Sequence, residues 1–158
     1  MIWHYTVGDN FASIYHSGVI QPATDYIALG EKPIVWFTTE EFWEPTVTKG
    51  RRRPDGTVED LGMRELVAEG FLLWRIGVAP ETAPYKWPEL KKLSGMPSEE
   101  AAHLAKIAKD KGGHPSRWRG TFIPVQAESW KAIQFFNRLE WVPFDPNPKQ
   151  RTTKQNHG

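Results

Sequence analysis

Polar side chains that could hold a ligand occur inside two short apolar segments of this sequence. Residues 2–6 read Ile-Trp-His-Tyr-Thr, and residues 34–39 read Ile-Val-Trp-Phe-Thr-Thr. Imidazole and hydroxyl groups offer hydrogen-bond donors and acceptors to a sugar or an amide, and aromatic rings offer a face for stacking. The two segments together therefore indicate a site for a flat, polar ligand.

The two segments have the pattern of buried strands, because they are rich in β-branched and aromatic residues and end at turn residues. Side chains alternate between the faces of a strand, so His4 shares a face with Thr6, and Trp36 shares a face with Thr38. His4 and Thr6 are candidate ligand contacts, although a lone buried histidine is as often a satisfied core residue. Trp36 and Phe37 form either a stacking platform or ordinary core packing.

Three acidic residues stand beside predicted strands. Glu128 lies in a short turn between the apolar runs 122–125 and 130–136. Taken alone, it is best explained as a solvated turn residue. Glu40 and Glu41 follow the second strand directly and are its rivals as a functional acid.

A basic run lies in the segment 48–62, which also contains Gly and Pro and shows no periodicity. This pattern predicts an exposed, mobile loop. Arg51, Arg52 and Arg53 could contact phosphates, because a guanidinium group binds phosphate oxygens in a bidentate manner. Without interleaved aromatic residues the run is a weak nucleic-acid signal. We recognise no phosphate-binding glycine loop, dinucleotide fingerprint, nucleophile elbow or zinc cluster, so no metal is expected.

The composition narrows the class of protein. The chain has 158 residues, which is about one domain, and no Cys, which excludes disulfides and thiolate chemistry and fits a reducing compartment. A net charge of +1 creates no overall attraction to nucleic acid or to a membrane. No apolar run approaches the roughly 20 residues of a membrane span, and the N-terminus has no signal-peptide pattern. We therefore expect a cytoplasmic protein without a membrane partner.

The elements that must position these residues are short. A helix is expected over residues 10–17, with the turn Gly8-Asp9-Asn10 supplying its N-cap and Gly18 its C-cap. Residues 145–158 are rich in Pro, Asn, Lys and Gln and are expected to be a disordered tail after a single α+β domain over residues 1–144. The other expected elements are strands at 71–78, 118–125 and 141–144, helices at 87–93 and 98–111, and a strand or short helix at 130–136.

The order of these motifs resembles that of the ADP-ribosyltransferase superfamily. A His-Tyr-Thr strand is followed by a helix that ends in Gly at residues 11–18, by the aromatic and hydroxyl strand at residues 34–39, and by a late glutamate. There is no Glu-x-Glu motif, but Gln126-Ala127-Glu128 fits the Gln-x-Glu pattern of enzymes that modify Arg or nucleic acid. The resemblance implies a split, bent antiparallel β-sheet core with short helices and NAD in the cleft between its halves.

The resemblance also implies an activity, the transfer of ADP-ribose from NAD to a protein or nucleic-acid acceptor with release of nicotinamide. Cleavage of the nicotinamide–ribose bond develops oxocarbenium character, which a nearby carboxylate stabilises. The implied site consists of His4 and Thr6 at a ribose, Trp36 or Phe37 near nicotinamide, Thr38 supporting the ribose, Glu128 as the catalytic acid and Gln126 orienting the acceptor.

Two other classes of function remain open from the sequence. The chain could be a non-catalytic module that binds a nucleotide or a protein partner through the same cleft. It could also be a nuclease or another hydrolase that uses His4 and an acid, with the basic segment holding phosphates. Neither the acceptor nor the oligomeric state follows from the sequence.

Overall fold

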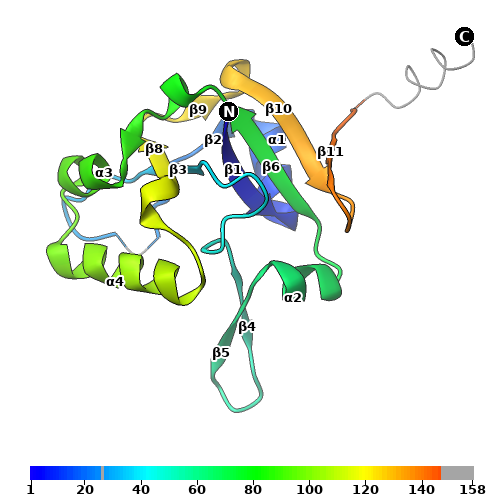
Figure 1. The fold of residues 1–158 in the computed structure, drawn as a ribbon, viewed down its shortest axis with the longest axis horizontal. Helices are drawn as coiled ribbons and strands as arrows, with labels where there is room; N and C mark the ends of the chain where they lie inside the picture. Colours follow the sequence, from blue (N-terminus) through cyan, green and yellow to red (C-terminus); the bar gives the residue numbers. More distant parts are fainter. Residues whose placement is uncertain (26, 147–158) are drawn as a thin grey trace, which may run out of the picture.

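The computed structural model describes residues 1–25 and 27–146, and its largest element is an antiparallel sheet in the order β11-β10-β6-β1-β3-β8-β7 (Figure 1). Two small sheets pair β2 with β9 and β4 with β5. The strands are β1 (Ile2–Val7), β2 (Val19–Ile20), β3 (Val35–Thr38), β4 (Lys49–Arg52), β5 (Val58–Leu61), β6 (Leu73–Val78), β7 (Tyr85–Lys86), β8 (Trp118–Thr121), β9 (Val125–Gln126), β10 (Trp130–Phe136) and β11 (Trp141–Pro143).

Helices cover the sheet at several places. In Figure 1, α3 and α4 lie together at the left, and the β4–β5 hairpin projects away from the sheet at the bottom. The expected α+β domain is thus confirmed, and residues 130–136 form a strand. The α-helices are α1 (Gly8–Ser17), α2 (Met63–Ala68), α3 (Trp87–Ser94) and α4 (Ser98–Asp110), and the 3-10 turns are η1 (Pro80–Thr82), η2 (Pro115–Arg117) and η3 (Ala127–Ser129).

The sheet is weakly joined at its centre. β1 pairs with β6 along six residues, from Ile2 opposite Val78 to Val7 opposite Leu73. On its other side, β1 pairs with β3 only where Trp3 lies opposite Thr38. Past that pair the two strands separate, and we call this opening the sheet break. It divides the sheet into β11-β10-β6-β1 on one side and β3-β8-β7 on the other.

The core consists of three apolar clusters, and β1 contributes to two of them because its side chains alternate. Ile2 packs with Phe11 of α1 in the first cluster. Trp3 and Tyr5 pack with Leu66 of α2 in the second. The third cluster joins β3 and β8 to α3 and α4, and its buried members are Ile34, Trp87, Leu90, Ala101, Ala108 and Trp118.

Three expectations about local structure are wrong. Residues 48–62 contain the β4–β5 hairpin rather than an irregular loop, because four residue pairs form a ladder from Lys49 opposite Leu61 to Arg52 opposite Val58. Helix α1 begins at Gly8, and its N-cap residue Val7 makes no side-chain capping bond, so residues 8–10 form the first turn instead of the cap. Residues 118–125 form two strands, β8 and β9, that belong to different sheets.

Other expectations hold. Gly18 ends α1 in the left-handed conformation, with φ 71°. The helices expected at 87–93 and 98–111 are α3 and α4, and the edge strand expected at 141–144 is β11. No helix in residues 1–25 and 27–146 is both long and apolar enough to cross a membrane. Most of the tail expected at 145–158 lies outside the described residues.

Candidate functional site

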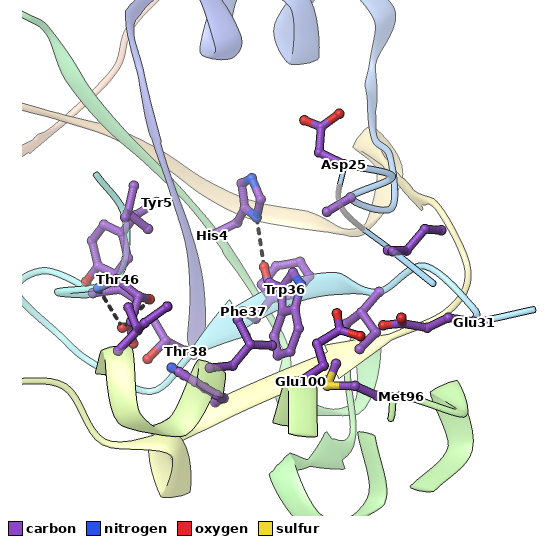
Figure 2. Close-up of a pocket in the computed structure, with 18 of the residues that line it drawn as sticks. His4, Tyr5, Asp25, Glu31, Trp36, Phe37, Thr38, Thr46, Met96 and Glu100 are labelled. Carbon is purple, nitrogen blue, oxygen red and sulfur yellow. Dashed lines mark hydrogen bonds between the residues drawn. The ribbon is translucent and has the colours of Figure 1, made fainter. Parts of the chain in front are cut away.

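A cavity of about 420 Å³ opens at the sheet break. Figure 2 shows side chains from β1 and β3 at its centre, with the segment before β3 on one side and the segment after β3 on the other. Helix α4 contributes Glu100, Leu104 and Ile107 to its wall. The predicted residues His4, Trp36, Phe37 and Thr38 all line this cavity, so the structure brings together four of the five predicted cofactor-binding residues.

His4 spans the sheet break with its side chain. Its Nδ1 lies 2.8 Å from the carbonyl oxygen of Trp36 (Figure 2). A carbonyl oxygen only accepts hydrogen bonds, so Nδ1 carries the proton and Nε2 of the neutral ring is an acceptor. Burial lowers the pKa of His4, and its bond to the Trp36 carbonyl opposes this only in part. The imidazole is therefore neutral, and its Nε2 has no hydrogen-bond partner among the described residues.

Aromatic rings form one wall of the cavity. Phe37 meets the His4 ring edge-on at a centroid distance of 5.7 Å and is a buried core residue. Trp36 is partly buried and packs edge-on against Trp118 at 5.6 Å. The Thr38 hydroxyl accepts a hydrogen bond from the Glu40 backbone N–H at 3.1 Å and keeps its own proton for another partner. The rings of Phe37 and Trp36 thus pack in the apolar core and also line the cavity.

Glu44, which the sequence analysis did not single out, is a buried acid on the cavity wall. Its side chain is 5% exposed, and its Oε2 accepts hydrogen bonds from the Thr46 N–H at 3.1 Å and the Thr46 hydroxyl at 2.7 Å. Its Oε1 is buried without a hydrogen-bond partner. An unpaired buried carboxylate oxygen is costly for the fold, so Glu44 is a candidate to meet a donor group of a ligand.

The segment that carries Glu44 is fixed by three bonds to its backbone. The Tyr5 hydroxyl donates to the Glu40 carbonyl, Arg75 donates to the Glu41 carbonyl, and the Trp141 indole donates to the Phe42 carbonyl at 2.8 Å. We call residues 40–47 the strap. These long-range bonds, together with the packing of Trp43 against Tyr5 and Trp141, place Glu44 in the cavity. The residues next to Glu44 in the sequence therefore gave no signal.

Arg75 is the main anchor of the strap. It is 9% exposed, and its guanidinium carbon lies 3.8 Å from the ring centre of Trp3 and 4.7 Å from that of Trp141. Its Nε donates to Gln134 at 2.8 Å, and it also donates to the Tyr5 hydroxyl. Burial raises the pKa of Tyr5 to about 12 although Arg75 lowers it, so the phenol stays a donor to the strap.

Two further carboxyl groups face each other at the other end of the cavity (Figure 2). Glu31 is buried and accepts a hydrogen bond from the Ala28 N–H at 2.9 Å. The pKa of Glu100 is raised by burial first, and then by a hydrogen bond to Glu31 and repulsion from its charge. The raised pKa favours the protonated form of Glu100, whose O–H can then donate to Glu31. With Asp25 and Glu44, four carboxyl groups line the cavity.

A second, smaller pocket of about 370 Å³ shares His4, Tyr5 and Val47 with the first cavity. We call it the Thr6 pocket. Thr6, the fifth predicted cofactor-binding residue, lies here and is 5% exposed. The other polar residues of the Thr6 pocket are Asn10, Thr48 and Lys49.

The predicted catalytic residues lie elsewhere. Gln126 ends β9, opposite Val19 of β2, and Glu128 lies in the turn η3. Both side chains are exposed, and neither lines the cavity or the Thr6 pocket. The rival Glu40 forms an ion pair with Arg117, with 3.3 Å between its Oε1 and the arginine Nε. The roles predicted for Gln126 and Glu128 remain predictions.

The basic run is largely paired with acids of the same hairpin and of the helix that follows. Arg51 bridges Glu59, at 2.9 Å, and Glu69. Arg53 lies 3.5 Å from Glu59. Arg52 has no such partner among the described residues. The phosphate contacts predicted for these arginines would compete with the existing ion pairs.

No group of three or more His, Cys, Asp or Glu side chains within residues 1–25 and 27–146 could hold a metal ion. No protein-family model matches the chain, and neither the curated proteins nor the solved structures include a match to it. The function is therefore inferred from the geometry of the cavity and from the motifs of the sequence.

Proposed function

We propose that the protein binds NAD at the sheet break and transfers its ADP-ribose group to an acceptor, as an ADP-ribosyltransferase. The observation that carries the proposal is the meeting of His4 on β1 with Trp36, Phe37 and Thr38 on β3 around one cavity. The separation of β1 from β3 past a single residue pair is compatible with the split core that the resemblance implies.

The cavity suits the nicotinamide end of NAD in chemical terms. The Nε2 of neutral His4 accepts a hydrogen bond from a ribose hydroxyl, and Thr38 offers its own hydroxyl proton nearby. The aromatic wall packs against the nicotinamide ring. This ring carries a positive charge in NAD⁺. The carboxyl groups of Asp25, Glu31, Glu44 and Glu100 outnumber Lys32 in the lining, so the cavity favours a cation.

The reaction breaks the bond between ribose C1′ and the nicotinamide nitrogen. Nicotinamide leaves with the bonding electron pair, and the ribose gains oxocarbenium character. A nucleophile of the acceptor then bonds to C1′ and loses its proton. A carboxylate near the ribose lowers the barrier by stabilising positive charge that develops only in the transition state.

Two acids compete for this catalytic role. The resemblance assigns it to Glu128, which lies in an exposed turn outside the cavity. The geometry favours Glu44, whose carboxyl group lines the cavity that holds His4. Substitution of each acid separates the two assignments.

The proposal is tested by NAD⁺ binding and turnover. We expect calorimetry to detect NAD⁺ binding and chromatography to detect released nicotinamide. His4→Ala should weaken binding by about tenfold, as expected for a lost hydrogen bond in a buried site. His4→Gln, which keeps a donor for the Trp36 carbonyl, controls for loss of the fold. Equal NAD⁺ affinity in the parent and in folded His4 variants would place the NAD site elsewhere.

A non-catalytic nucleotide-binding module is the second candidate, and one observation favours it. Neither Gln126 nor Glu128 reaches the cavity, so the implied catalytic set is incomplete there. A module would bind NAD⁺ without releasing nicotinamide. The hairpin does not support the nuclease alternative, because its Arg51 and Arg53 are already paired with glutamates and not available for phosphates.

A further inference from the structure

We infer that the Thr6 pocket is a phosphate-binding site. It is formed by β1, the first turn of α1 and the residues that lead into β4. Its ligand is a phosphate or diphosphate group. Three features of the pocket support this inference.

The first feature is the Thr6 hydroxyl. Thr6 is 5% exposed and lines the pocket, yet its hydroxyl makes no hydrogen bond among the described residues. The hydroxyl oxygen is not among the fully buried atoms that lack a partner, so it is open to the pocket although the rest of the side chain is buried. A ligand with acceptor oxygens in the pocket can therefore accept the hydroxyl proton without breaking any bond within the protein.

The second feature is the charge of the lining. Lys49 is the cation of the pocket, and none of its lining residues is an acid. The Lys49 ammonium lies 4.9 Å from the ring centre of Phe71 and forms no ion pair among the described residues, unlike Arg51 beside it. Asp9 lies in the first turn of α1 but is not part of the lining. The pocket therefore favours an anion.

The third feature is the N-terminus of α1. The N-cap residue Val7 provides no side-chain bond, and the Gly8 N–H is bonded to the Leu72 carbonyl. The following N–H groups of the first turn have no intrahelical acceptor, as at any helix start, and carry the positive end of the helix dipole. Val7 and Asn10 of this region line the pocket. Uncapped helix starts of this kind bind phosphate groups.

The two pockets, both lined by His4, then have opposite electrical character. Four carboxyl groups and Lys32 line the first cavity, whereas the Thr6 pocket has Lys49 and no acid in its lining. NAD⁺ has a positive nicotinamide ring at one end and a negative diphosphate in its middle. Its ring belongs in the first cavity and its diphosphate in the Thr6 pocket, an orientation that rests on the proposed function.

The experiment titrates the intact protein with inorganic pyrophosphate in a calorimeter at low salt. We expect binding that weakens about tenfold in Thr6→Val and in Lys49→Met, since each variant removes one hydrogen bond to a charged ligand. The matched control is Arg52→Met, which removes the same charge from the same strand outside the pocket and should change affinity less than twofold. Absence of binding, or equal loss in Arg52→Met, would overturn the inference.

Stability measurements keep the experiment interpretable. Val has nearly the shape of Thr, and the Thr6 hydroxyl has no protein partner to lose, so Thr6→Val should melt at or above the temperature of the parent. If Thr6→Val unfolds, Lys49→Met, which alters an exposed side chain, provides the same test.

A competition measurement separates the phosphate site from the proposed function. Pyrophosphate should raise the apparent dissociation constant of NAD⁺ if the diphosphate occupies the Thr6 pocket. Binding of pyrophosphate without competition would refute the orientation of NAD⁺ and leave the phosphate site standing. Binding of pyrophosphate without any binding of NAD⁺ would refute the proposed function alone.

Discussion

At the scale of single residues, His4 decides what the cavity can offer a ligand. Its Nδ1 proton is engaged by the Trp36 carbonyl, so the ring presents an acceptor at Nε2. Protonation at Nε2 would remove that acceptor and place a positive charge beside the aromatic wall. The lowered pKa of His4 keeps the neutral form down to a lower pH than in an exposed histidine.

The lowered pKa also makes stability depend on pH. An unfolded histidine takes up a proton as the pH falls through about 6.5, whereas folded His4 does so only at lower pH. The stabilisation from neutral His4 is therefore complete above about pH 6.5 and is lost as the pH falls toward the folded pKa. We expect the melting temperature to fall less between pH 7.5 and 5 in His4→Gln than in the parent. Parallel melting curves for the two proteins would contradict this assignment.

The two candidate acids are distinguished by paired amide substitutions. Glu44→Gln should lower the rate of nicotinamide release by about 10²–10³, the usual cost of one lost electrostatic contact in a transition state, with a nearly unchanged KM for NAD⁺. Glu128→Gln should leave the rate within about twofold if Glu44 is the acid. The opposite pattern would support the assignment from the resemblance. Full activity in both variants would exclude both acids from the catalytic role, whereas NAD⁺ binding without nicotinamide release in the parent would favour the binding module.

At the scale of elements, the strap connects the two sides of the sheet break. It leaves β3 on one side and is held by Tyr5, Arg75 and Trp141 on the other. The position of Glu44 therefore depends on residues from three other strands. A cavity built in this way is sensitive to substitutions that never touch a ligand.

Arg75→Lys tests the role of this anchor. A lysine keeps the charge but cannot donate simultaneously to Gln134, Tyr5 and the Glu41 carbonyl in the planar geometry of a guanidinium. We expect the free energy of unfolding to fall by about 2 kcal/mol, as for one or two lost bonds to a charged group. Urea denaturation would measure the change. Arg64→Lys on the exposed face of α2 is the control. Equal losses of unfolding free energy in the two variants would show that the bonds of Arg75 to the strap add no stability.

The elements also show what the sequence could predict. Alternation of apolar and polar residues placed His4 and Thr6 on one face of a strand, and Gly18 marked the end of α1. The hairpin at 48–62 was missed because cross-strand ion pairs such as that of Arg51 with Glu59 hold it, not an apolar pattern. Glu44 was missed because contacts with residues far away in the sequence bury it. For Glu128, the sequence indicated a turn but could not indicate which way the turn faces.

At the scale of the whole molecule, the three core clusters are not independent. β1 gives Ile2 to the first cluster and Trp3 and Tyr5 to the second, and β3 joins the first cluster to the third through Phe37 and Trp36. If one cluster unfolded, the strands that it shares with a second cluster would become exposed to solvent. Shared strands of this kind favour unfolding as a single cooperative unit.

Cooperative unfolding is a testable expectation. The tryptophans occur in the second and third clusters or beside the first, so their fluorescence samples the whole core. In urea, fluorescence and far-ultraviolet circular dichroism should change with one common midpoint. Separate midpoints would mean that the side of the sheet with β3, β8 and β7 unfolds apart from the rest.

The single backbone pair between β1 and β3 has a consequence for exchange with solvent. By position, β1 is the middle strand of seven, but past Trp3 only β6 pairs with its backbone among the described residues. Amide protons of β1 that face β6 should exchange with deuterium only on global unfolding, whereas those facing β3 past Trp3 should exchange as quickly as on an outer strand. A ligand that fills the break would slow the second set alone, so deuterium uptake along one strand would report occupancy of the cavity.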